Sequence, residues 1–177
     1  MAEEQVVLVD ENDKEIGYMG KQEAHVKGLL HRAFSIFLMN DKGEWLLQQR
    51  ALSKYHSPGL WTNACCSHPR KGETTLDAAH RRLMEELGIS VASLSKTYHF
   101  LYKADVGGGL IEHELDHVYV GTYNDVPNFN KEEVADYIYI SLEDLEVDMT
   151  ENPTKYTEWF KITFNDFKKH INADTIK

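Results

Sequence analysis

The sequence predicts an α+β fold, a layered α/β/α domain in which a mixed sheet lies between helices. Strand-like and helix-like segments alternate along the chain, and no linker or low-complexity stretch interrupts them. The chain of 177 residues, 42% of them hydrophobic, is long enough to bury one proper core. We therefore expect residues 1–177 to form a single domain without internal repeats.

Four extended segments are expected in the first part of the chain. Their hydrophobic patterns predict strands at Gln5–Val9, Arg32–Met39 and Glu44–Arg50, and a short extended piece at Trp61–Cys66. Asp10–Asp13 suits a turn after the first strand. Asn40–Gly43 has the composition of a hairpin turn, which predicts that the second and third strands pair.

One helix is marked at both of its ends. Thr74 and Asp77 form a cap pair at its start, and Gly88 is the residue type that ends helices in the left-handed conformation. The predicted helix runs from Thr74 to Leu87. Its buried stripe is expected to consist of Leu76, Ala79, Leu83 and Leu87.

The second half of the chain alternates again between strands and helices. Strands are predicted at Leu94–Ala104 and Leu110–Gly121, separated by three glycines, and at Asp136–Ile140. Ser141 caps a short helix. Asn152 and Pro153 open the last helix, whose inward side chains are Tyr156, Phe160, Phe164 and Phe167.

The formal net charge of −10 disfavours nucleic acid and anionic membranes as partners, because both are negatively charged. A small anionic substrate is compatible with that charge, since it needs only a local basic cluster or a bound cation. No apolar run approaches the ~20 residues of a membrane span, and the N-terminus lacks the features of a signal peptide. Cys65 and Cys66 are adjacent, so a bond between them would be strained and would constrain no loop. We expect reduced thiols and a cytoplasmic protein.

Three carboxylates share one face of a predicted strand. Glu112, Glu114 and Asp116 alternate along it at ~7 Å spacing, followed on the same face by Val118 and Val120. A solvent-exposed face is the ordinary explanation of such a pattern. The change to valine instead indicates a strand that runs from an open site into a core, where a cation between the glutamates would remove their repulsion.

Histidines near segment ends are candidates to join these carboxylates. His25, His31 and His68 lie in such places among the nine histidines of the chain. Any one of them alone is more commonly a surface or hydrogen-bonded histidine than a metal ligand. Their spacing matches no zinc-finger pattern. The residues by themselves therefore allow a His/Glu metal site without requiring one.

The segment Trp61–Ile89 combines a cysteine, a histidine and a helix rich in arginine and glutamate, and its last part resembles a Nudix box. The box-like run extends from Arg81 to Ile89 and is preceded by Glu73. Together with HRAFS (31–35), QQRALSK (48–54), WTNACCSHP (61–69), His25 and the Glu112/Glu114 pair, the chain resembles the type 1 isopentenyl-diphosphate isomerases. The resemblance covers roughly residues 5 to 167 and implies a Nudix-like sheet between helices.

The resemblance also implies the roles of individual residues. It implies a site for one divalent metal (Mg²⁺, Mn²⁺ or Zn²⁺) whose ligands are His25, His31, His68, Glu112 and Glu114. Cys66 matches the catalytic thiol, and Glu114 matches the carboxylate that faces it. Tyr102 matches a hydroxyl near that carboxylate, and Trp159 an aromatic ring over the hydrocarbon of the substrate.

A second group of residues is implied to hold a diphosphate. Glu86 matches the ligand of a Mg²⁺ ion that accompanies it, and the basic residues that match its phosphate-binding groups are Lys21, Arg50, Lys54 and Arg82. The implied reaction interconverts isopentenyl and dimethylallyl diphosphate through a tertiary carbocation, in isoprenoid precursor biosynthesis. The sequence leaves open which metal is bound and whether the protein is a monomer or a dimer. It also leaves open whether Cys66 or Glu114 donates its proton first.

Each implied role has a simpler alternative. The alternatives are core packing for Trp159, a small buried apolar residue for Cys66, and ordinary surface charges for Arg50 and Lys54. The two i,i+4 Arg–Glu pairs of the helix also suit a solvated helix face. The joint occurrence of these residues in matching order favours the site.

The chain departs from the family patterns at two positions. Ser67 stands where a glycine is usual, and if the backbone there requires a positive φ it carries strain of ~1 kcal/mol or more. Arg82 replaces a glutamate of hydrolytic Nudix enzymes, which weakens metal-assisted water activation and suits phosphate binding. Isomerisation is therefore expected. The alternatives are a Nudix hydrolase of a nucleoside diphosphate derivative and a diphosphate-binding module without turnover.

Overall fold

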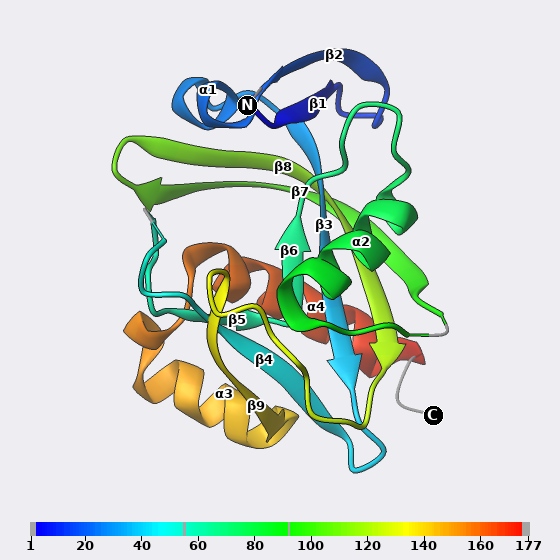
Figure 1. Ribbon diagram of the computed structural model, residues 1–177, viewed down its shortest axis with the longest axis vertical. Coiled ribbons are helices and arrows are strands. Elements are labelled where there is room, and N and C mark those ends of the chain that lie inside the picture. Colours follow the sequence, from blue (N-terminus) through cyan, green and yellow to red (C-terminus); the bar gives the residue numbers. More distant parts are fainter. Residues whose placement is uncertain (1–2, 55, 92, 175–177) are drawn as a thin grey trace.

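The computed structural model describes residues 3–54, 56–91 and 93–174. A mixed β-sheet runs through the molecule, and helices cover both of its faces (Figure 1). Helix α2 (Thr75–Leu87) packs on one face over a core that includes Phe34 and Ile36, whereas α4 (Glu158–Asp174) packs on the other face over Phe37 and Val118. This layering confirms the predicted α+β fold.

Strand β3 (His31–Met39) lies in the middle of the sheet and pairs with other strands along both of its edges. It pairs in parallel with β8 (Leu110–Thr122) and antiparallel with β6 (Cys65–Ser67). Strand β8 also pairs with β7 (Ser95–Gly107) in a long antiparallel hairpin. Strand β3 therefore lies between two strands that are far apart in sequence: β6, which carries the thiols, and β8, which carries the carboxylates.

A second group of strands is built on β4 (Glu44–Arg50). This strand pairs antiparallel with β5 (Trp61–Asn63) and β9 (Val134–Ser141). The hairpin expected between β3 and β4 is limited to the single pair Met39–Trp45. The two strands diverge beyond the turn because each completes its backbone hydrogen bonds with other strands, which places β4 beside the cavity described below.

Helix α2 confirms the signals read at its ends. The Thr74 hydroxyl accepts a hydrogen bond from the Asp77 N–H at 3.1 Å, and Gly88 ends the helix in the left-handed conformation. The expected stripe was wrong at Leu76, which is 40% exposed. The buried face of α2 uses Ala78 in its place, and the small Ala78 and Ala79 side chains let the helix approach the sheet closely.

Two elements were not predicted, β2 (Glu15–Gly20) and the short α1 (Lys21–Lys27) that follows it, and the predicted start of the last helix was wrong. Pro153–Lys155 forms a single 3₁₀ turn and α4 begins only at Glu158, after α3 (Leu142–Glu151) with its Ser141 cap. All four predicted inward aromatics of this segment are buried. None of the described helices is long and apolar enough to cross a membrane.

Candidate active site

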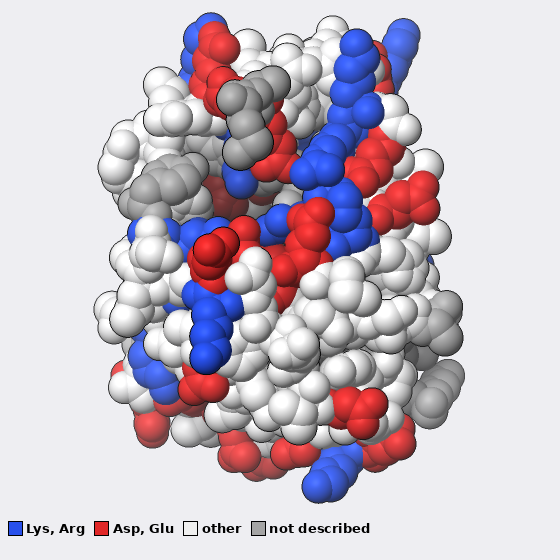
Figure 2. All heavy atoms as spheres, viewed as in Figure 1, with Lys and Arg blue, Asp and Glu red and all other residues white. Residues whose placement is uncertain are grey.

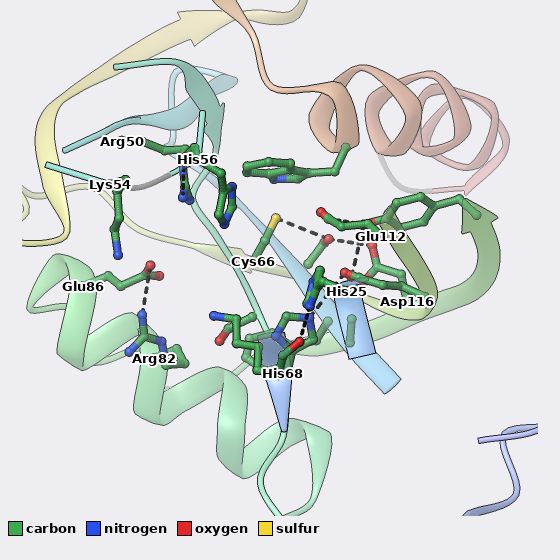
Figure 3. A pocket seen from close by; sticks show the side chains of 18 residues that line it. His25, Arg50, Lys54, His56, Cys66, His68, Arg82, Glu86, Glu112 and Asp116 are labelled. Carbon is green, nitrogen blue, oxygen red and sulfur yellow. Dashed lines mark hydrogen bonds and ion pairs between the residues drawn. The ribbon is translucent and has the colours of Figure 1, made fainter. Parts of the chain in front are cut away.

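One cavity brings the predicted site residues together. It opens between α1, α2, β6, β8 and the start of α4, and every predicted site residue except His31 lines it. Figure 2 shows a hollow in this face with basic and acidic side chains around it. In Figure 3 the Cys66 sulfur points into the middle of the cavity, while Arg82 and Glu86 extend from α2 at its edge.

The three predicted histidine ligands form a compact cluster next to the cavity. His25 comes from α1, His31 from the first residue of β3 and His68 from the residue after β6, and their ligand atoms all lie within 4.8 Å of one another. The Nδ1 atom of His25 lies 2.6 Å from the Lys21 carbonyl, and that of His31 lies 2.8 Å from the Leu29 carbonyl. These carbonyls accept the Nδ1–H proton, which leaves Nε2 with a free lone pair.

Electrostatics favour the neutral form of this cluster. Burial lowers the pKa of His25, and burial, followed by the charge of His68, lowers the pKa of His31 well below its usual value. Burial lowers the pKa of His68 in the same way. Neutral imidazoles with free lone pairs are the form that binds divalent metals. The cluster therefore fits a metal ion.

The two glutamates of β8 complete this constellation. Register pairs Glu114 with His31, and the Glu114 Oε1 atom lies 3.4 Å from His68 Nε2. Glu112 and Glu114 are 7% and 4% exposed, so the face is not a solvated one. Burial raises the pKa of Glu114 to about 7, and burial together with the charge of Glu114 raises the pKa of Glu112 well above its usual value. A divalent cation beside the two buried carboxylates and the neutral histidines would offset the negative charge that burial disfavours.

Tyr102 lies where the sequence predicted a hydroxyl. It extends from β7, and its O–H lies 3.1 Å from Glu112 Oε1 and 3.2 Å from Glu114 Oε2. Burial, followed by the charges of the two glutamates, raises the pKa of Tyr102 well above its usual value. The phenol is therefore protonated and can donate a hydrogen bond to either carboxylate.

Cys66 is surrounded by polar groups of known orientation. Its thiol donates to Asn63 Oδ1 at 2.8 Å, and the amide nitrogen of Asn63 donates to the Ile36 and Cys65 carbonyls. Ser35 Oγ lies 3.5 Å from the sulfur and donates to Asp116 Oδ2 at 2.7 Å. Burial, followed by the charge of Asp116, raises the pKa of the Cys66 thiol.

Trp159 combines the two roles that the sequence left open. It is 5% exposed, belongs to the core between α4 and the sheet, and also lines the cavity. The Arg50 guanidinium lies over its ring at 5.0 Å from the centroid. The indole thus presents π density to the cavity while its body packs in the core.

Arg50, Lys54, Arg82 and Glu86 lie on the side of the cavity away from His25 (Figure 3), and Lys21, the first residue of α1, also lines it. Arg82 Nη2 lies 3.2 Å from Glu86 Oε1, and Lys54 pairs with Glu133. Arg50 donates to the His56 carbonyl at 3.2 Å. Cations held in fixed positions beside a carboxylate suit a diphosphate with its accompanying metal.

Six further residues line the cavity and were not among the predicted site residues: Ala33, Phe34, Ser35, His56, Ser67 and Asp116. The alternation of β8 had placed Asp116 on the right face, whereas His56 lies in a loop whose spacing carries no signal. Burial and the nearby Arg50 charge lower the pKa of His56 to about 3. The possible strain at Ser67 is absent, because this residue pairs with Phe34 as part of β6 and has no positive φ.

Comparison with known proteins identifies the family of the chain. A model of the NUDIX domain matches residues 29–160. An isopentenyl-diphosphate Delta-isomerase of Pectobacterium atrosepticum is 54% identical over 160 residues, which cover 90% of this chain and 89% of that protein. Another from Serratia proteamaculans is 51% identical and covers 93% of this chain and 91% of its own.

Solved structures resemble the fold at lower identity. A protein from Deinococcus radiodurans superposes with a TM-score of 0.68 at 21% identity, covering 84% of this chain and 90% of its own. The MutT protein of Methanosarcina mazei gives 0.65 at 18% identity, with 82% and 96% covered. The domain match and the close relatives together place the sequence: the chain belongs to the Nudix family and, within it, to the isopentenyl-diphosphate Delta-isomerases.

Proposed function

We propose that this protein interconverts isopentenyl diphosphate and dimethylallyl diphosphate, a step of isoprenoid precursor biosynthesis. The observation that carries the proposal is the shared cavity, in which the Cys66 thiol, the buried Glu114 carboxylate and a group of basic side chains lie together. A hydrolase has no need of a buried thiol, and a binding module has no need of an acid and a base at the same place.

Moving a double bond from the end of the chain to an internal position requires one proton to be added and another to be removed. In our proposal, Cys66 and Glu114 are the two groups that exchange protons with the substrate. Tyr102 orients the Glu114 carboxylate through its O–H, and Asn63 holds the thiol in place. The low basicity of an alkene makes this fixed positioning necessary.

The intermediate of such a reaction is a tertiary carbocation, which the cavity is suited to stabilise. The Trp159 ring lines the cavity and supplies π density, worth ~2 kcal/mol when both groups are desolvated. Its indole and the neighbouring core side chains also exclude water, which would otherwise trap the cation as an alcohol. The buried surroundings thus protect the intermediate.

We propose two metal positions from the donor sets. His25, His31, His68, Glu112 and Glu114 would hold one divalent ion, Mg²⁺, Mn²⁺ or Zn²⁺, and Glu86 would face a Mg²⁺ ion that arrives with the diphosphate. Bound divalent ions supply positive charge that offsets carboxylates and phosphates. Lys21, Arg50, Lys54 and Arg82 hold the diphosphate, and this remote binding energy orders the hydrocarbon between Cys66 and Glu114.

A product assay tests the proposal. Purified protein is incubated with isopentenyl diphosphate and Mg²⁺, either as prepared or after removal of bound metal, and the products are separated by chromatography. We expect dimethylallyl diphosphate only in the metal-containing sample. Release of phosphate would instead support the hydrolase alternative, and binding without any product would support the binding module.

Two further proposals concern the location of the protein in the cell and its domain organisation. We propose a cytoplasmic protein, supported by two neighbouring cysteines that are both free thiols. We also propose that residues 1–177 act as one domain, because the cavity takes side chains from α1 near the start and from α4 near the end. Limited proteolysis that releases a stable fragment would contradict this second point.

A further inference from the structure

Cys65, the neighbour of the cavity thiol, has a charged partner although it is completely buried. Its sulfur is 0% exposed and donates to Glu86 Oε2 at 2.7 Å. Side chains alternate along β6, so Cys66 points into the cavity while Cys65 points to the opposite side, towards α2. One short strand therefore directs one thiol into the cavity and the adjacent thiol to Glu86 on α2.

The Glu86 carboxylate is held at both of its oxygens. Oε2 accepts from the Cys65 thiol, and Oε1 lies 3.2 Å from Arg82 Nη2. The Glu86 backbone carbonyl also accepts from the Asn130 N–H at 2.8 Å, which fixes the end of α2. Glu86 is 7% exposed and its side chain lines the cavity. Two contacts on different oxygens prevent the carboxylate from rotating about its last bond.

We infer that Cys65 is a positioning residue that orients Glu86 for the metal-bound diphosphate. The inference rests on the proposed function, in which Glu86 faces Mg²⁺. Groups that hydrogen-bond to a metal ligand from behind fix its direction, and their loss commonly lowers metal affinity 10- to 100-fold. Without the thiol, Oε2 is left buried with no donor from β6, and the side chain is free to turn away from the cavity.

The competing explanation is packing alone. Cys65 belongs to the apolar cluster under α2, beside Ala64, Ala79 and Leu83, and a buried cysteine often acts only as a small apolar residue. The two explanations require different properties of the side chain at position 65. Packing needs bulk and is satisfied by valine, whereas positioning needs a hydrogen-bond donor and is satisfied by serine. The pair Cys65→Val and Cys65→Ser therefore separates them.

The test measures binding of Mg²⁺ and inorganic diphosphate to the metal-loaded protein by titration calorimetry, which involves no turnover. We expect Cys65→Val to weaken binding of the Mg²⁺–diphosphate complex about 10-fold or more, and Cys65→Ser to restore most of that loss. Equal affinity of Cys65→Val and wild type would overturn the inference, as would a serine variant that binds as weakly as the valine variant.

Steady-state kinetics provide a second readout. The positioning role acts through Glu86 and not through Cys66, so we expect Cys65→Val to raise the KM for isopentenyl diphosphate and the Mg²⁺ concentration required. The kcat at saturating Mg²⁺ and substrate should change much less. A fall in kcat with KM unchanged would indicate that Cys65 acts through Cys66 and not through Glu86, and would overturn the inference.

An infrared measurement tests the hydrogen bond itself and needs no change at Cys65. The chain has only two cysteines, so a Cys66→Ser variant contains a single S–H group, that of Cys65. Its stretching band should lie at the low frequency of a strongly bonded thiol and should rise when Glu86→Gln is added. A band that does not move would show that the thiol does not donate to Glu86 and would overturn the inference.

These measurements remain separate from the test of the reaction. The product assay on the wild type decides whether isomerisation occurs and does not involve Cys65. Calorimetry and infrared spectroscopy decide whether the thiol orients Glu86 and do not require isomerisation. A wild type without turnover, combined with the expected valine and serine results, would remove the proposed function and keep the positioning role at a diphosphate site.

Discussion

The immediate contacts of the Cys66 sulfur keep its proton in place until the substrate arrives. The Asn63 amide nitrogen donates to two backbone carbonyls, which orients the amide so that its oxygen Oδ1 faces the thiol and accepts a hydrogen bond from it. Burial and the nearby carboxylates of Asp116 and Glu114 disfavour a negative charge on the sulfur and raise the pKa of the thiol. These surroundings favour the protonated thiol, which is the form required by the proton-carrier role that we propose for Cys66.

Removing this thiol tests its role at the scale of one residue. We expect Cys66→Ala to lower kcat by about 10²–10⁴-fold, the usual contribution of a positioned acid or base. The melting temperature should change little, because a half-buried side chain is shortened and no buried charge is exposed. Cys66→Ser, which keeps the shape, should be similarly impaired since an alcohol exchanges its proton less readily. Full activity in either variant would contradict the assigned role.

The two glutamates of β8 can be distinguished in the same way. Both Glu112→Gln and Glu114→Gln remove one charge from the metal cluster, so we expect both to lower the metal content measured by mass spectrometry. Only Glu114 is assigned a proton transfer. Restoring metal by excess Mg²⁺ or Mn²⁺ should therefore recover turnover in Glu112→Gln but not in Glu114→Gln. Recovery in both variants would assign Glu114 to metal binding alone.

Among the elements, α2 connects most directly to the site, since it carries Arg82 and Glu86. Its start is held by a pair that joins the helix to the loop before it. Arg81 donates from Nε and Nη2 to the two oxygens of Glu73 at 2.7 and 2.9 Å, and the Arg70 N–H donates to the same carboxylate. Hydrogen bonding from Arg81 lowers the pKa of Glu73. The loop before α2 is thereby fastened to the second turn of the helix.

This pair predicts a pH-dependent contribution to stability. The folded-state pKa of Glu73 lies below its unfolded value, near 4.3, so the stabilisation is present above that value. It is lost as pH falls through the folded-state pKa. We expect Glu73→Gln to lower the free energy of unfolding by about 1–2 kcal/mol at neutral pH and to approach the wild type once pH falls below the folded-state pKa. Urea unfolding at several pH values measures this.

Glu23→Gln is the matched control for that measurement. Glu23 pairs with Lys27 on the exposed side of α1, with both side chains about half exposed. Exposed pairs of this type contribute roughly 0–1 kcal/mol. The control should therefore change stability less than Glu73→Gln does. An equal effect of the two substitutions would mean that the pair at the start of α2 contributes no more to stability than an exposed pair does.

At the scale of the whole molecule, the histidine–glutamate cluster links parts of the chain that are distant in sequence. Its members come from α1, the start of β3, the end of β6 and β8. A metal ion held there would join all four elements. Without it, two buried carboxylates and three neutral histidines remain close together, an arrangement that costs stability.

Removal of metal should therefore lower the melting temperature of the entire protein. With the free ion at a concentration about 100 times its dissociation constant, binding raises the free energy of unfolding by about 2.7 kcal/mol. For a chain of this size this corresponds to a rise of roughly 5–10 °C in the melting temperature. Calorimetric melting with a chelator and after metal is restored measures the difference. A His68→Ala variant should lose the response, and His99→Ala, outside the cluster, should keep it. An unchanged melting temperature on chelation would contradict a metal at this site.

Local features were predictable because their causes lie within a few residues. The Thr74 cap and the Gly88 terminus of α2 depend on neighbouring backbone groups, and alternation along β8 depends on strand geometry alone. The motifs around Cys66 and Glu86 also selected the residues that share the cavity. Leu76 shows the limit of periodicity, because Ala78 took its place once the distance between α2 and the sheet was set.

What the sequence determined by itself was the chemistry available: which strand carries carboxylates on one face, where α2 begins and ends, and which side chains can carry protons or bind metal. Only the tertiary structure decided which of them meet. The parallel pairing of β3 with β8 sets Glu114 beside His31, and the packing of α2 on β6 brings Cys65 to Glu86. Such contacts depend on how distant elements pack, and packing is a property of the whole core that no local pattern contains.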